Sequence, residues 1–96
     1  MSDKIEVQNV NAPDHVTRVD RAKYEAMHAA LMGAITSDAP GMTAAELKSA
    51  LLQTLDPALF PGGEKSGWWM KTVQLDLEAK GVIARADTKP LRFRKL

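Results

Sequence analysis

The apolar residues between positions 20 and 80 recur at spacings of three and four, which predicts three amphipathic helices. The first helix begins after Asp20, whose side chain is a suitable N-cap, and ends near Thr36, before a segment that contains Pro40 and Gly41. Its apolar stripe consists of Tyr24, Met27, Leu31 and Ile35.

The second helix has the clearest start signal in the chain. Thr43 can accept a hydrogen bond from the backbone N–H of Glu46, and the Glu46 carboxylate can accept one from the backbone N–H of Thr43, which is a capping box. Met42 and Leu47 stand where a hydrophobic staple would place them. We expect this helix to end at Asp56, the residue before a proline. Its apolar stripe consists of Leu47, Leu51 and Leu55.

The third helix is predicted from about Ser66 to Lys80, with Gly81 as a left-handed terminator. Projection at about 100° per residue gives it two apolar stripes and only a narrow polar sector. The stripe facing the core consists of Met70, Val73 and Leu77, with Trp69 at its edge. The second stripe consists of Trp68, Thr72, Leu75 and Ala79. The polar sector consists of Lys71, Gln74 and Glu78, and Asp76 stands alone on the other side of the helix.

The two ends of the chain have the alternation of strands. Residues 82–87 and 90–96 predict a hairpin in which Leu91 and Phe93 face one way, while Arg92 and Arg94 face the other. Residues 1–19 predict an arm that contains a short strand at residues 4–10 and a loop after it, and both an ordered arm and a frayed tail remain open. The fold class is therefore α+β, mainly α.

The segment LDLEAKGVIAR, residues 75–85, resembles a winged helix-turn-helix domain, in which a third helix ends at a glycine and an apolar pair opens the first strand of the wing. The resemblance covers residues 20–96, which would form one domain after the arm, residues 1–19. TAAELKSALLQTL resembles the preceding helix of that motif. The combination of VDRAKYEAM, FPGG, GWW and VQLDLEAKG is also similar to a small family of uncharacterised bacterial proteins.

The resemblance implies DNA binding, with the third helix in the major groove and the C-terminal hairpin as a wing on the backbone. Charge is consistent with this, because residues 1–60 carry a net charge of −3 and residues 61–96 carry +4. The expected nucleic-acid contacts are Lys71 and Gln74 in the groove, with Arg85, Lys89, Arg92 and Arg94 on phosphates. The same arginines can alternatively protect an edge strand from pairing. The connection formed by residues 56–65 is longer than the tight turn of the motif.

The second apolar stripe of the third helix supports another function. Trp68 and Leu75, if exposed, would be the nucleus of a protein interface with a second copy or another partner. Two further readings of the tryptophan pair stay open. In one, Trp69 is in the core and residues 1–19 or Phe60 cover Trp68; in the other, Trp68 stacks on nucleic-acid bases.

Composition points away from catalysis. The chain has no cysteine, which excludes disulfides, thiolate metal sites and thiol nucleophiles. His15 and His28 lack the spacing of a metal pair, and no serine stands in a nucleophile elbow. No apolar run approaches a membrane helix or a secretory signal, so we expect a cytoplasmic protein that has no membrane contact, no metal and no cofactor.

The sequence thus leads to two hypotheses. The first is a non-enzymatic, transcription-regulator-like protein that binds double-stranded DNA. The second is a protein-interaction or dimerisation module on the same fold, without nucleic acid.

Overall fold

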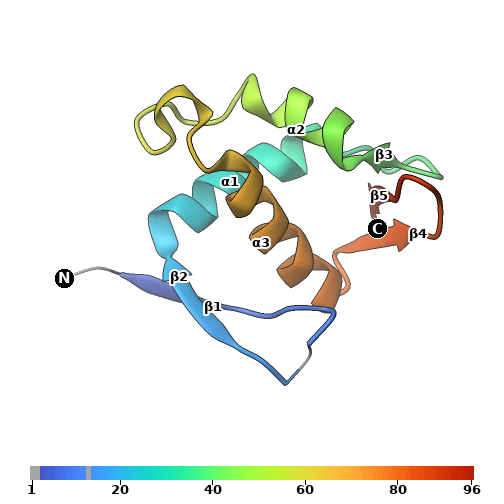
Figure 1. The fold of residues 1–96 in the computed structure, drawn as a ribbon, viewed down its shortest axis with the longest axis horizontal. Helices are drawn as coiled ribbons and strands as arrows, with labels where there is room; N and C mark the ends of the chain where they lie inside the picture. Colours follow the sequence, from blue (N-terminus) through green and yellow to red (C-terminus); the bar gives the residue numbers. More distant parts are fainter. Residues whose placement is uncertain (1–2, 13) are drawn as a thin grey trace.

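Three α-helices and two small antiparallel sheets make up the described chain, residues 3–12 and 14–96 of a computed structural model (Figure 1). The helices are α1 (Arg21–Ala34), α2 (Ala44–Leu52) and α3 (Ser66–Ala79), and each contacts the other two. A single 3₁₀ turn, Pro61–Gly63, lies in the connection before α3. This confirms a small α+β fold. None of the helices in the described ranges is long and apolar enough to cross a membrane.

The predicted helix starts are confirmed. The Asp20 side chain accepts a hydrogen bond from the backbone N–H of Lys23 at 3.0 Å. The capping box is complete. The Thr43 amide donates to the Glu46 carboxylate at 2.9 Å, and the Glu46 amide donates to the Thr43 hydroxyl oxygen at 3.1 Å. The helix α2 ends at Leu52, earlier than expected, because the next amides bond to carbonyls only three residues back.

The C-terminal hairpin consists of β4 (Ile83–Ala86) and β5 (Arg92–Lys95), as predicted. A third strand, β3 (Met42–Thr43), pairs with β5, so that the sheet order is β3–β5–β4. Sequence reasoning missed β3, because two residues are too short to show a period. Gly81 has φ of 73°, which confirms the left-handed end of α3.

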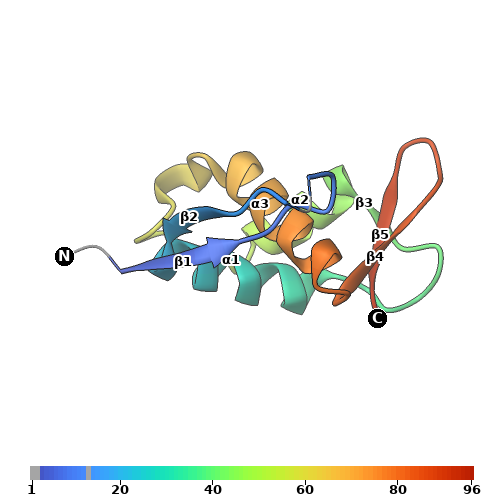
Figure 2. The ribbon, with the colours of Figure 1, turned by 90° about the horizontal axis from the view of Figure 1, so that it is seen from below.

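The N-terminal arm is an ordered hairpin in its described part. Strand β1 (Lys4–Val7) pairs antiparallel with β2 (Thr17–Asp20), and the hairpin lies beside α1 and α3, on the opposite side from α2 (Figures 1 and 2). Val7 is 4% exposed and belongs to the same core as the helices. Residues 1, 2 and 13 of the expected arm lie outside the described residues.

A buried carboxylate attaches this arm to the helices. Asp76 is fully buried and accepts hydrogen bonds from the backbone N–H of Gln8 at 2.8 Å, from Lys80 Nζ at 2.9 Å and from the Tyr24 hydroxyl. Burial, followed by the hydrogen bond to Asp76, raises the pKa of Tyr24. The isolated polar position of α3 is therefore an anchor that joins α1, α3 and β1.

Candidate functional site

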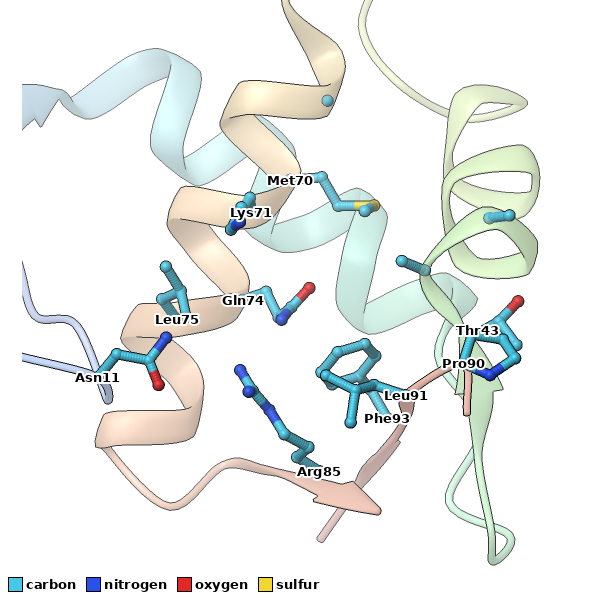
Figure 3. A pocket seen from close by; sticks show the side chains of 13 residues that line it. Asn11, Thr43, Met70, Lys71, Gln74, Leu75, Arg85, Pro90, Leu91 and Phe93 are labelled. Carbon is cyan, nitrogen blue, oxygen red and sulfur yellow. The ribbon is translucent and has the colours of Figure 1, made fainter. Parts of the chain in front are cut away.

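A pocket of about 470 Å³ opens between α3, the start of α2 and the β4–β5 hairpin (Figure 3). Its larger apolar side chains come from α3 and from the hairpin, and no Asp or Glu is among the described residues that line it. The two cationic residues that line it are Lys71 and Arg85. The other main lining residues are Met70, Gln74, Leu75, Leu91 and Phe93. Two residues of the predicted groove-reading face thus border a pocket with an apolar wall and a cationic rim.

Gln74 does not have the exposure that we expected. It is 5% exposed, because the hairpin folds back over this turn of α3, and its side chain points into the pocket toward Phe93 (Figure 3). Its amide makes no hydrogen bond to the described residues, yet no fully buried polar side-chain atom there lacks a partner. The Gln74 amide therefore meets solvent through the pocket. The contact of Gln74 with DNA bases stays a prediction. It assumed that Gln74 lies on an exposed face of α3, which is not the case.

Arg85 is held in place by internal contacts. Its Nε and Nη2 atoms donate to Glu78 at 2.8 and 2.9 Å, and its guanidinium lies 5.7 Å from the ring centroid of Phe93. The hydrogen bonds that Arg85 donates to Glu78 raise the pKa of Arg85, so the guanidinium stays charged. Because Glu78 supplies the opposing charge, Arg85 contributes much less free positive potential than the sequence predicted.

Arg92 is also engaged. It donates to the Gly41 carbonyl at 3.0 Å and lies 3.4 Å from Glu46, whose pKa is lowered by hydrogen bonds from Thr43 and then by the charge of Arg92. Strand register also separates the cations. Arg85 pairs with Phe93, whereas Arg92 pairs with Ala86, so Arg85 faces the pocket and Arg92 faces the other side of the sheet.

The remaining predicted cations have no ion pair with the described residues. Lys71 and Lys89 are exposed, and Arg94 is half-buried. Arg94 pairs with Ala84 and shares the outer sheet face with Arg92, away from Lys71 and Arg85. Lys71, Gln74 and Arg85 therefore border the pocket while Arg92 and Arg94 lie on the outer face of the sheet, so these predicted nucleic-acid residues do not form one continuous patch.

The two tryptophans have different environments. Trp69 is 7% exposed, which confirms its core position, and Phe60 packs edge-on against it with ring centroids 6.3 Å apart. Trp68 is 58% exposed, so the expectation that the arm or Phe60 covers it is wrong. Leu75 is only 9% exposed, because the arm runs beside it. Of the predicted interface residues Trp68 and Leu75, Trp68 alone is therefore exposed.

Two features of the site were missed by sequence reasoning. The pairing of Arg85 with Glu78 joins a strand to a helix, and no spacing in the sequence indicates it. The buried role of Asp76 did leave a signal, because an acid between Leu75 and Leu77 on an otherwise apolar side needs a partner. No group of three or more metal-ligating side chains lies within the part of the chain that the structure describes.

Comparison with known proteins identifies a family whose function is unknown. Residues 4–93 match the model of a family of unknown function, DUF6958, and the chain belongs to that family. No curated protein and no solved structure matches the chain.

Proposed function

We propose that this member of a family of unknown function is a non-enzymatic winged helix-turn-helix protein that associates with a second copy of itself through the exposed face of α3. The element order supports the fold assignment, because three helices precede a C-terminal hairpin and β3 completes its sheet. The exposure of Trp68 carries the functional part of the proposal.

Trp68 stands out among the side chains of α3. Its neighbours on the core stripe are almost fully buried, whereas 58% of Trp68 is in contact with solvent. A large aromatic side chain gains free energy when a partner removes it from water, and tryptophan is enriched among the residues that dominate interfaces. Interaction therefore explains Trp68 better than core packing does.

The surface beside Trp68 supports a second copy as the partner. A hollow of about 230 Å³ lies next to the tryptophan, between α3 and the arm, and Val7, Val19 and Leu75 contribute apolar lining. A two-fold axis close to Trp68 would bring each indole toward the hollow of the other copy, which is an isologous contact. The net charge of +1 gives little repulsion between two copies.

Sedimentation velocity from micromolar to millimolar concentration tests this proposal. We expect the weight-average sedimentation coefficient to rise with concentration, and Trp68→Ala to weaken association about thirtyfold, which corresponds to about 2 kcal/mol. The matched control is Leu52→Ala, which removes another exposed apolar side chain, 41% accessible, from α2. A wild-type protein that remains monomeric throughout, or equal effects of the two variants, would refute self-association.

DNA binding is the second candidate, favoured by the absence of ion pairs at Lys71, Lys89 and Arg94 within the described ranges. An anisotropy titration on mixed-sequence duplex DNA at several salt concentrations tests it. We expect Arg94→Ala to reduce the magnitude of the salt slope by about one, whereas Arg85→Ala, at a cation that is already paired, changes it less. No binding at low salt, or binding whose salt slope is unchanged in Arg94→Ala, would eliminate this candidate.

A further inference from the structure

We infer that the pocket between α3 and the β4–β5 hairpin is a binding site for a small organic carboxylate with an apolar body. This inference does not depend on self-association, because Trp68 does not line the pocket and, of the described residues that line the pocket, Leu75 alone also lines the hollow beside Trp68. Its volume of about 470 Å³ is in the range of small-molecule sites, which are mostly apolar with a few polar groups that fix orientation.

The charge of the lining selects an anion. Lys71 contributes a positive charge that has no ion pair with the described residues, and Arg85 adds guanidinium donors although Glu78 balances its charge. No Asp or Glu is among the described residues that line the pocket. Arg85 is preorganised, since Glu78 and Phe93 fix its guanidinium before any ligand arrives. The bond to Glu78 uses Nε and Nη2, and an arginine has five N–H donors, so Nη1 remains to donate toward a ligand.

Gln74 is an independent sign of a ligand. Gln74 is 5% exposed, and a polar residue buried to this extent usually has hydrogen-bond partners within the protein, whereas the Gln74 amide reaches solvent through the pocket. The Gln74 amide has none among the described residues and points into the pocket (Figure 3). It can donate to one carboxylate oxygen while the cations bind the other.

The apolar part of the ligand has a defined wall. Met70 from α3 and Phe93 from β5 are buried at the inner side, and Leu91 lies at the hairpin end, 38% exposed. An aromatic or branched aliphatic body placed there would cover Leu91 and the open side of Phe93. The carboxylate is therefore placed beside Lys71, Gln74 and Arg85, and the apolar body lies against Met70, Leu91 and Phe93.

Phenylbutyrate and its uncharged analogue phenylbutyramide form a matched pair of probes. Heteronuclear NMR titration of the full chain should show saturable shifts of the Gln74 side-chain amide and the Arg85 Nε–H signals with phenylbutyrate. We expect the amide analogue to bind about tenfold more weakly or worse, since it loses a charge-assisted hydrogen bond. Equal affinity of the two probes, or shifts scattered away from the pocket, would overturn the inference.

Variants locate the site and separate it from the interface proposed above. Lys71→Ala removes an exposed cation without disturbing the core, and we expect about tenfold weaker phenylbutyrate binding. Lys23→Ala on α1 is the control and should leave binding unchanged. Trp68→Ala should also bind the probe normally, whether or not the wild type self-associates. If Lys71→Ala binds as the wild type does, or if an acidic peptide saturates these signals while phenylbutyrate does not, the small-carboxylate site is refuted.

Discussion

The carboxylate of Asp76 on α3 accepts a hydrogen bond from the hydroxyl of Tyr24 on α1, although 52 positions separate the two residues in the sequence. The same carboxylate accepts from the backbone of Gln8 in the arm and from the side chain of Lys80, the C-cap residue of α3. One buried carboxylate therefore joins α1, α3 and the arm, which are far apart in the sequence. Its hydrogen-bond partners offset the cost of burying a charge.

Removal of either partner should show how much stability this junction supplies. Asp76→Ala leaves the buried Tyr24 hydroxyl and the Gln8 amide without their acceptor, and we expect a loss of about 2–4 kcal/mol in the free energy of unfolding. Tyr24→Phe removes one donor while the carboxylate keeps two, so about 1–2 kcal/mol is expected. Urea denaturation measures both. A Tyr24→Phe effect as large as that of Asp76→Ala would contradict the assignment of Asp76 as the centre.

The titration of Tyr24 supplies a test that depends on pH. Tyr24 is the chain's one tyrosine, so tyrosinate absorbance reports it alone. Its pKa is raised above the ordinary value of about 10 by burial and then by Asp76. Because the folded state then holds the proton more tightly than the unfolded state, the stabilisation is fully present below pH about 10 and is lost as pH rises through the folded pKa.

We therefore expect tyrosinate to appear only well above its ordinary pH in the wild type, or together with unfolding. Asp76→Asn retains the burial but removes the negative charge, so its Tyr24 should ionise at lower pH than in the wild type. Circular dichroism at each pH separates ionisation of the folded protein from unfolding. Ionisation near the ordinary pKa in a folded wild type would show that the hydroxyl is solvated.

The helical part of the fold was predictable because its signals are local. The capping box at Thr43 and the glycine at position 81 each depend on residues within one turn, and both are confirmed. Strand β3 and the pairing of the arm were not predictable, because they depend on partners far away in sequence. Met42, for example, pairs with Phe93, and the sequence around Met42 carries no sign of it.

The candidate site was predictable only in part, for a similar reason. Helical projection placed Trp69 correctly in the core and Lys71 correctly on the outside. It treats a helix as an isolated cylinder, however, so it cannot show that the hairpin covers Gln74 or that the arm runs beside Leu75. The partners of Arg85 and Arg92 are likewise tertiary contacts.

Hydrogen exchange should reveal whether the arm opens separately from the helices. The Gln8 amide donates to Asp76, and we expect it to be protected in the wild type. In Asp76→Asn one oxygen can still accept, but the ion pair with Lys80 is lost, so exchange at Gln8 should accelerate more than exchange in the middle of α1. Equal acceleration at both places would mean that the arm and the helices open as one unit.

Two glycines give opposite predictions for the same substitution. At Gly41, φ is 104°, and a Cβ atom would lie 2.3 Å from the carbonyl oxygen of Phe93, which is backbone and cannot move aside without disturbing β5. Gly41→Ala should therefore destabilise the protein by about 2 kcal/mol or more. At Gly33 in α1, a Cβ would meet nothing within 4 Å.

Gly33→Ala should stabilise the protein by about 0.5 kcal/mol, because alanine restricts the unfolded chain and favours the helix. Urea midpoints of the two variants measured side by side provide the comparison, and each serves as the control for the other. The expected difference in stability between the two variants depends on the close approach of residue 41 to β5. This approach lies next to the Met42–Phe93 pair, through which β3 joins the sheet. If Gly41→Ala were as stable as the wild type, the β3–β5 pairing would have to be wrong.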